Sequence, residues 1–250
     1  MFPWLNIELT SRCNRACSFC GRAKKREQGW KIGDIDIELL RHIIDQFPGS
    51  IIQFHRDGEP LLYDKLSEVS VICHNHVTNI VSNGLLLWER HQDIKGFDTV
   101  CISVIDDNPE QFEVIKRFHE NCMKPRLLIK FLGDYYNPEF EKMGLQTTRR
   151  RIHNPSGDWH YQKEDKPVIP ELFVCQDFLM KPSVDWQGDF YICNRFDPER
   201  LGKLGNLKDS SLESLWYGEQ RLGWLNKHLQ GKRADIPLCE NCQFWGVAKE

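Results

Sequence analysis

The sequence lacks the features that direct a chain into or across a membrane. Its first residues, MFPWLNIELTSRC, contain no basic segment followed by an apolar one, so they do not predict a signal peptide. No apolar run approaches the ~20 residues of a transmembrane helix. Pro155 after Asn154 excludes that position as a glycosylation acceptor, and no other Asn-x-Ser/Thr triplet occurs. These absences predict a soluble, cytoplasmic protein with no membrane partner.

The chain also lacks a large net charge of either sign. The chain has 33 Lys and Arg against 36 Asp and Glu, a net charge of -3. This balance excludes a general attraction to nucleic acid, although a local basic patch, and with it a nucleic-acid partner, stays open. In a reducing compartment, the 10 cysteines are expected to be metal ligands or buried thiols rather than disulfides.

The first part of the chain alternates short apolar runs with amphipathic segments. Helical spacing predicts helices over 35–47 and 108–122, the second capped by Asn108 with Pro109 at its first position. The runs between them are too short for helices and predict strands at 4–9, 50–55, 76–82, 98–104 and 126–131. This alternation predicts an α/β fold with a parallel sheet, in the form of a partial (β/α)6 TIM-like barrel.

The alternation breaks over 133–170, where Pro- and Gly-containing stretches predict mostly loop. Beyond it, 182–193 predicts a hairpin around Gln187-Gly188, and 211–229 predicts one or two helices. The predicted units are a barrel domain at 1–150, a linker at 151–170 and a small α+β domain at 171–250.

Three cysteines stand close together in RCNRACSFCGR at 12–22. Cys13, Cys17 and Cys20 are too many for one disulfide and too few for a closed tetrahedral metal site. Three thiolates on a four-iron cubane leave one iron without a protein ligand, and an open metal position is where chemistry occurs. Half of a zinc site is the alternative that the spacing leaves open.

This spacing, in a loop after the first predicted strand, resembles the signature of the radical S-adenosylmethionine (SAM) superfamily. Phe19, just before the third cysteine, is part of the resemblance. It implies that Cys13, Cys17 and Cys20 hold a 4Fe–4S cluster whose unique iron is chelated by SAM. It also implies a reductant such as flavodoxin or ferredoxin, and cleavage of SAM to a 5'-deoxyadenosyl radical that abstracts a substrate hydrogen.

Further counterparts of family motifs follow later strands. Asp57-Gly58-Glu59-Pro60 resembles the family's Gly-Gly-Glu-Pro, which meets the SAM amino group, but has Asp in place of the first Gly. By itself, Gly-Glu-Pro is no more than a turn. Ser82-Asn83-Gly84 resembles an Asn-Gly turn of the family, and Ser103 stands where members contact the ribose or carboxylate. The residues that the resemblance places around SAM are Phe19, Gly58, Glu59, Pro60, Asn83 and Ser103.

Four more cysteines lie in the C-terminal part, at Cys175, Cys193, Cys239 and Cys242. Four thiolates close a site around either zinc or a 4Fe–4S cubane, and spacing alone favours zinc. The spacing, together with GNLKDSSLESLW at 205–216, resembles the SPASM auxiliary-cluster domain of radical SAM enzymes. Because no cysteine follows Cys242, the resemblance is to the shorter "twitch" form with one auxiliary cluster.

The layout is similar to that of a twitch dehydrogenase of aminoglycoside biosynthesis. It implies oxidation or rearrangement of a C–H or alcohol group in a small polar or nucleotide-like substrate, with the auxiliary cluster as electron acceptor. One alternative is SPASM-type modification of a peptide or protein residue, which the absence of a leader-binding segment before Cys13 disfavours. The other is a non-enzymatic zinc-binding module.

The remaining cysteines and the basic runs have simpler interpretations. Cys73, Cys101 and Cys122 are predicted to be buried, inert thiols. The basic residues of 22–26 and 149–151 are interpreted as solvated surface charges. For the arginines of 149–151, the alternative is a contact with a phosphate or carboxylate of the substrate.

Overall fold

The computed structural model describes residues 2–150, 174–195, 197–240 and 242. Within them, nine strands form one sheet in the order β6-β5-β4-β3-β2-β1-β7-β8-β9. The strands are β1 (Trp4–Ile7), β2 (Ile51–Phe54), β3 (Val77–Ser82), β4 (Thr99–Val104), β5 (Arg126–Leu132), β6 (Gln146–Arg150), β7 (Ser183–Val184), β8 (Asp189–Tyr191) and β9 (Lys203–Asn206). The first seven in the spatial order pair in parallel, whereas β8 and β9 are antiparallel.

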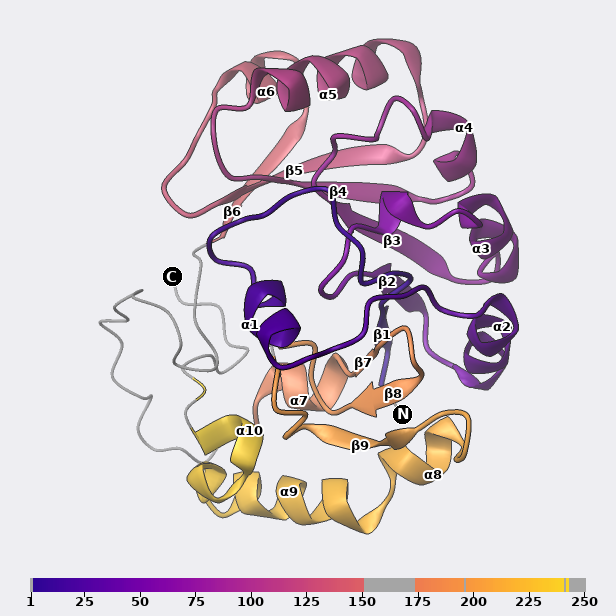
Figure 1. Ribbon diagram of the computed structural model, residues 1–250, viewed down its shortest axis with the longest axis vertical. Helices are drawn as coiled ribbons and strands as arrows, with labels where there is room; N and C mark the ends of the chain where they lie inside the picture. Colours follow the sequence, from indigo (N-terminus) through magenta and orange to yellow (C-terminus); the bar gives the residue numbers. More distant parts are fainter. Residues whose placement is uncertain (1, 151–173, 196, 241, 243–250) are drawn as a thin grey trace.

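Helices cover the sheet and connect its strands (Figure 1). They are α1 (Arg22–Glu27), α2 (Ile37–Gln46), α3 (Leu66–Ile72), α4 (His91–Ile94), α5 (Pro109–Asn121), α6 (Glu139–Lys142), α7 (Gln176–Met180), α8 (Leu212–Trp216), α9 (Glu219–Leu229) and α10 (Pro237–Glu240), with short 3-10 turns at Pro60–Leu62 and Arg233–Asp235. Figure 1 shows α2, α3 and α4 in a row along one face of the sheet, whereas α1 lies on the opposite side. Among the described residues, no helix is long and apolar enough to cross a membrane.

The predicted alternation of strands and helices is confirmed. All five predicted strands form, each within one or two residues of the expected ends. The Asn108 side chain accepts a hydrogen bond from the Gln111 N–H at 2.9 Å, so it caps α5 as predicted, with Pro109 in the first turn. The parallel α/β class is therefore confirmed. Along the described residues the sheet runs open from β6 to β9, and its curvature into a partial barrel stays a prediction.

The prediction of loop over 133–170 is wrong for its described part. This region contains α6 and β6, which pairs in parallel with β5 as a sixth strand of the alternating series. The sequence signal was weak because β6 is an edge strand with exposed residues, so it has no apolar alternation. Strand β9 was missed for a related reason, since none of its four residues is fully buried.

The C-terminal part continues the same sheet. Strand β7 pairs in parallel with β1, with Asn6 opposite Ser183. The predicted hairpin forms between β7 and β8, and Gly188 has φ +90°, which a residue with a side chain rarely adopts. The segment 211–229, predicted as one or two helices, consists of two, α8 and α9. The proposed linker at 151–170 lies outside the described residues, and the domain division stays a prediction.

The two faces of the sheet differ in chemistry. Leu5, Ile7 and Phe54 are fully buried in the apolar core beneath the helices. The alternate side chains form a polar row on the other face: Gln53 donates to Asn6 at 3.0 Å, and Asn79 donates to Gln53 at 2.9 Å. The strands therefore present a polar inner face, which ends at the edge where the first cysteine loop lies.

Candidate functional site

The first three cysteines lie together on the loop between β1 and α1. Cys13, Cys17 and Cys20 are all partly exposed, and the Cys20 N–H donates to the Cys17 carbonyl at 3.0 Å to form a tight turn. The Cys13 sulfur accepts a hydrogen bond from the Arg15 N–H at 3.4 Å. Three thiols on one accessible loop at the carboxyl ends of parallel strands form the expected setting for a reactive site.

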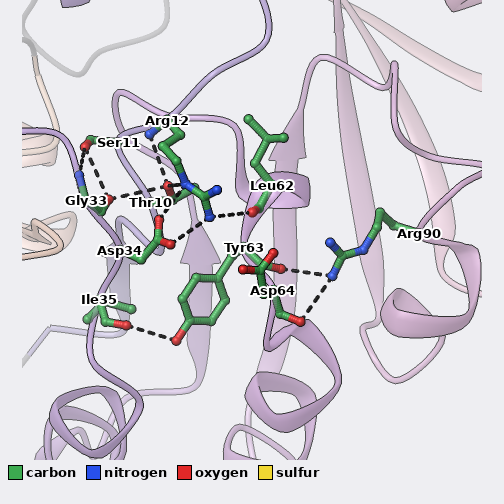
Figure 2. A network of polar contacts seen from close by, with 10 residues as sticks. All are labelled: Thr10, Ser11, Arg12, Gly33, Asp34, Ile35, Leu62, Tyr63, Asp64 and Arg90. Carbon is green, nitrogen blue, oxygen red and sulfur yellow. Dashed lines mark hydrogen bonds and ion pairs between the residues drawn. The ribbon is translucent and has the colours of Figure 1, made fainter.

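Arg12 anchors this loop immediately before Cys13 (Figure 2). Its guanidinium donates to both carboxylate oxygens of Asp34, at 3.0 and 2.7 Å, and to the Leu62 carbonyl at 2.8 Å. The Arg12 N–H also donates to the Thr10 hydroxyl at 3.1 Å. One side chain thus ties the cysteine loop to the segment after α1 and to the 3-10 turn after β2, in a geometry that lysine does not reproduce.

Gly58 allows a second backbone segment to approach the cysteine loop. A Cβ at this position would lie 1.8 Å from the Thr10 carbonyl oxygen, far inside any allowed contact. The neighbouring Glu59 N–H donates to the Arg12 carbonyl at 2.7 Å. The glycine of this motif is therefore required because the two loops cross at backbone contact.

The Glu59 carboxylate is occupied by contacts within the protein. It is 2 % exposed and accepts hydrogen bonds from the Leu61 N–H, the Ser82 hydroxyl and the Asn83 N–H, at 3.0, 2.8 and 2.7 Å. Burial raises the pKa of Glu59, and these donors partly offset that effect. Its carboxylate joins the motif after β2 to the turn after β3, and Pro60 starts the 3-10 turn beside it.

Asn83 contacts the first cysteine of the loop although it is distant from it in the chain. Its amide donates to the Cys13 sulfur at 3.9 Å and to the Asn14 side chain at 2.7 Å. Ser103 and Phe19 are both partly exposed, and the Ser103 carbonyl accepts from the Gln111 amide at 3.0 Å. The polar contacts of the described residues therefore bring Gly58, Glu59 and Asn83 to the cysteine loop, and the roles of Phe19, Pro60 and Ser103 toward SAM stay predictions.

The second group of cysteines lines one cavity of about 430 Å³. Cys175 precedes α7, Cys193 follows β8, and Cys239 and Cys242 lie at the end of the described chain. The other lining residues are Asp177, Phe178, Ile192, Arg195, His228, Arg233 and Leu238. Three separate segments thus converge on a largely apolar cavity lined by four thiols.

His228 is a buried polar residue that contacts one of these cysteines. It is 1 % exposed, its ring lies 4.7 Å from that of Phe178, and its Nε2 stands 3.9 Å from the Cys239 sulfur. Burial, with the charge of Arg233, lowers the pKa of His228 to about 4, so the imidazole is neutral. The neutral ring donates to Cys239 if its proton is on Nε2. No motif marked His228 in the sequence.

Burial raises the pKa of thiols at both sites. It does so for Cys20, to about 11, and for Cys239, to about 12. The pKa of Cys193 is also raised well above its ordinary value, by burial first, with Arg195 opposing the shift and Asp177 and the neighbouring thiols adding to it. A cysteine must be a thiolate to bind a metal. At these raised pKa values, the thiolate form requires a strong positive charge nearby, such as that of a metal centre.

The thiols fit a group larger than one ion. Ligands of a single zinc lie ~3.8 Å apart, given Zn–S bonds of about 2.3 Å. Among the described residues, no three His, Cys, Asp or Glu side chains are arranged to hold a single metal ion. The four C-terminal thiols instead line one common cavity. A thiolate-ligated iron–sulfur cluster suits this donor set and this space.

The prediction of solvated charges needs correction for one of the two basic runs, whereas Arg149 and Arg150 of the other are exposed as predicted. The run at 22–26 is not simply solvated, because Arg22 is 9 % and Lys25 is 5 % exposed. Lys25 forms a close ion pair with Asp57, the residue that departs from the family motif. Arg149 lies over the Tyr136 ring, and Arg151 lies outside the described residues. Of the remaining cysteines, Cys73 and Cys101 are buried as predicted, but Cys122 is partly exposed.

A buried polar group between the two cysteine sites was missed by sequence reasoning. Arg56 contacts Asp57 at 3.5 Å, donates to the Ser183 hydroxyl and lies over the Tyr191 ring at 4.0 Å. Ser183 in turn donates to the Cys193 carbonyl at 3.0 Å. No local pattern predicts the contacts of Arg56 with Ser183 and Tyr191, because these partners lie more than a hundred residues away in the chain.

The comparisons with known proteins agree with this arrangement. Residues 175–243 match the family of the iron–sulfur cluster-binding domain SPASM. The S-adenosyl-L-methionine-dependent 2-deoxy-scyllo-inosamine dehydrogenase of Niallia circulans is 21% identical over 100% of this chain and 96% of its own length. Two solved structures share the fold: BtrN in complex with AdoMet and 2-DOIA, with a TM-score of 0.69 at 19% identity, and Streptococcus suis SuiB bound to S-adenosylmethionine, with 0.68 at 14%. The chain covers 96% of the first and 69% of the second.

Proposed function

We propose that this chain is a radical SAM enzyme that carries a SPASM iron–sulfur domain, and that it oxidises a C–H or alcohol group of a small polar substrate. Rearrangement of such a substrate is the related outcome. The observation that carries the proposal is the pairing of one accessible loop of three thiols with one cavity lined by four. The proposed cofactors are one SAM and two 4Fe–4S clusters.

In this proposal, Cys13, Cys17 and Cys20 hold the cluster that binds SAM. When bound, SAM and that cluster supply a 5'-deoxyadenosyl radical that removes a hydrogen from the substrate. Gly58 keeps the neighbouring loop at backbone contact with Thr10, and Glu59 holds the Asn83 turn beside Cys13. These residues position and enclose the cofactor, with Phe19, Pro60 and Ser103 as further proposed neighbours.

The proposed role of the second cluster is to accept an electron. A two-electron oxidation needs a second electron to leave after hydrogen abstraction, and a cluster with four protein ligands has no iron free for substrate. Cys175, Cys193, Cys239 and Cys242 are the proposed ligands. Their largely apolar surroundings support this role, because the hydrophobic shell of a metal site limits solvent access and tunes the redox potential. The first cluster would be reduced by a flavodoxin or ferredoxin.

The chemistry of the inner face supports a polar substrate. It carries the Asn6–Gln53–Asn79 row, with His55 next to it at the end of β2. Burial, with the charges of Lys130 and Arg150, lowers the pKa of His55 to about 3, so its ring is neutral. A cyclic polyol or its amine, the class that the name of the Niallia circulans relative indicates, offers hydroxyls to such groups. Oxidation of a small polar substrate is therefore the proposed function, in preference to modification of a peptide.

Anaerobic reconstitution with iron and sulfide tests the proposal. We expect about eight irons per chain from two cubanes, and 5'-deoxyadenosine after reduction in the presence of SAM. Cys13→Ser should abolish 5'-deoxyadenosine formation, whereas Cys122→Ser, outside both groups, should leave it unchanged. A colourless protein that takes up zinc and cleaves no SAM would instead support the zinc-binding module.

A further inference from the structure

A second cavity lies beside α1, between the first cysteine loop and the β7–β8 turn. Its volume is about 340 Å³. Its lining residues are Glu8, Ser11, Arg22, Lys25, Arg26, Trp30, Lys31, Ile32, Asp57 and Trp186. Four of these side chains are cationic and two are indoles, a composition that the proposed roles of SAM and the clusters leave unexplained.

The indole walls of this cavity are held in place. The Trp30 ring lies between Lys25, at 4.1 Å, and Arg200, at 4.3 Å, and its N–H donates to the Pro198 carbonyl at 3.1 Å. Trp186 packs against Gly33, where an added Cβ would lie 2.5 Å from the ring. The cavity is therefore formed before any ligand arrives, which lowers the entropic cost of binding.

The charge of the cavity is positive. Asp57 is the acidic group that is ionised, because Lys25 and Arg56 outweigh the effect of burial and keep its pKa below the ordinary value. Glu8 is buried, and burial followed by the charge of Asp57 raises its pKa to about 8, so it is mostly protonated near neutral pH. Arg22, Arg26 and Lys31 remain as positive charges beyond the Lys25–Asp57 pair.

Arg22 brings an unused donor to this cavity. The residue is 9 % exposed, and its Nη1 donates to the Arg15 carbonyl at 3.3 Å. Its Nη2 is buried and has no hydrogen-bond partner among the described residues. A buried guanidinium nitrogen without a partner is costly, and a carboxylate or phosphate oxygen is the acceptor that such a group binds best.

We propose that this cavity binds an anionic group of the substrate, a carboxylate or a phosphate, with Arg22 as its main donor. The exposed side chains of Arg26 and Lys31 add attraction at the mouth. Because α1 starts two residues after Cys20, a group held here keeps the rest of the substrate close to the first cysteine loop. The assignment to a substrate rests on the proposed function, whereas the anion site itself does not.

Calorimetric titration of the anaerobically reconstituted protein tests the site, with inorganic phosphate and succinate as probes at low ionic strength. We expect saturable binding of at least one probe, and at least about tenfold weaker binding in Arg22→Gln, the loss typical of one charge-assisted hydrogen bond. Arg26→Gln should weaken it about two- to threefold, through charge alone. Lys208→Gln, the same charge change on an exposed residue outside the cavity, should leave it unchanged.

Several outcomes would overturn the proposal. The first is that the unaltered protein binds neither phosphate nor succinate saturably. The second is that Arg22→Gln binds the probes as tightly as the unaltered protein but loses iron, which would show that Arg22 supports the cysteine loop and not an anion. Loss of phosphate and succinate binding when SAM is saturating would assign the cavity to the cofactor's own carboxylate. The 5'-deoxyadenosine assay reports separately on the proposed function: probe binding without SAM cleavage refutes that function but keeps the anion site.

Discussion

The two groups of cysteines differ in how the chain surrounds them. Cys13, Cys17 and Cys20 belong to one loop, all partly exposed, and hydrogen bonds from Arg12 and Glu59 hold that loop. The C-terminal four come from three separate segments and line a cavity with Phe178 and Ile192. The first group is organised by local sequence and polar contacts, and the second by packing over a long sequence distance.

This difference in construction matches a difference in chemistry. A partly exposed loop with three thiols can admit and release a further ligand, whereas a cluster held by four protein thiolates has no iron free for substrate. The proposed division of labour, with radical formation at the first site and electron acceptance at the second, needs this asymmetry. Changes that damage one site and spare the other therefore test the comparison directly.

Gly58→Ala is expected to have the largest effect. An added Cβ would lie 1.8 Å from the Thr10 carbonyl oxygen, so the loop must move and lose the hydrogen bond from the Glu59 N–H to Arg12. We expect the first cluster to be lost and the second retained, with iron falling from about eight to about four per chain. Formation of 5'-deoxyadenosine should then fall by about 100-fold or more.

Gly223→Ala is the matched control, because nothing lies within 4 Å of a Cβ at that position of α9. It should keep full iron content and gain about 0.5–1 kcal/mol of stability from the better helix former. If Gly58→Ala also kept all its iron and its SAM cleavage, the close crossing of the two loops would not be needed for the first site.

Cys193→Ser is expected to damage the second site alone. Its sulfur lines the cavity of the four C-terminal thiols, and a serine oxygen is a poor replacement for a thiolate on iron. Iron should fall to about four per chain, while 5'-deoxyadenosine formation stays within about threefold of the unaltered protein. Cys73→Ala, at a buried cysteine outside both groups, should keep both clusters. Equal loss of SAM cleavage in Cys193→Ser would show that the two sites are not separable.

More of the first site than of the second could be predicted from the sequence. The first could be predicted in detail because its parts are short motifs: the three-cysteine loop, Gly58-Glu59 and Asn83, each directly after a strand. The second could be predicted only as a set of cysteines. His228 stands beside Cys239 because α9 packs on α7, and the link from Arg56 through Ser183 to Cys193 joins residues far apart in the chain. Tertiary packing fixes such contacts, and no local period encodes them.

The His228 contact offers a smaller test, confined to the second site. His228→Phe keeps a ring against Phe178 but removes the contact of Nε2 with the Cys239 sulfur, in which the ring is the donor when its proton is on Nε2. A donor to a ligand sulfur stabilises the more negative, reduced cluster, so its loss should lower the midpoint potential. A net hydrogen bond of about 0.5–1.5 kcal/mol corresponds to a shift of roughly 20–60 mV for one electron. Redox titration followed by electron paramagnetic resonance measures it.

The cluster at the three-cysteine loop is the internal control, because His228 lines the other cavity. Its potential should be the same in His228→Phe and in the unaltered protein. A shift of both potentials by similar amounts, or a rise at the second site, would contradict the assigned direction of the hydrogen bond.

Glu8 joins the two regions, and its substitution should have the smallest effect. One carboxylate oxygen accepts from the N–H of Asp57, in the loop that crosses the first site, and the other from the N–H of Trp186, in the hairpin that leads to the second, both at 3.3 Å. Burial, and then the charge of Asp57, raises the pKa of Glu8 from 4.5 to about 8. The folded protein therefore keeps a proton that the unfolded chain has released.

The sign of the pH effect follows from this shift. The stability that protonated Glu8 contributes is fully present below about pH 4.5 and is lost as the pH rises through about 8, by at most about 1.4 kcal/mol per pH unit. Glu8→Gln carries no such charge, so its Tm should match that of the unaltered protein at about pH 4 and exceed it by a growing margin as the pH rises to 8.5. Glu213→Gln, at an exposed position of α8, should show no such crossover. If the unaltered protein instead gained stability over Glu8→Gln with rising pH, Glu8 would be ionised in the fold, and the link between the two sites would be an ion pair rather than a neutral carboxyl.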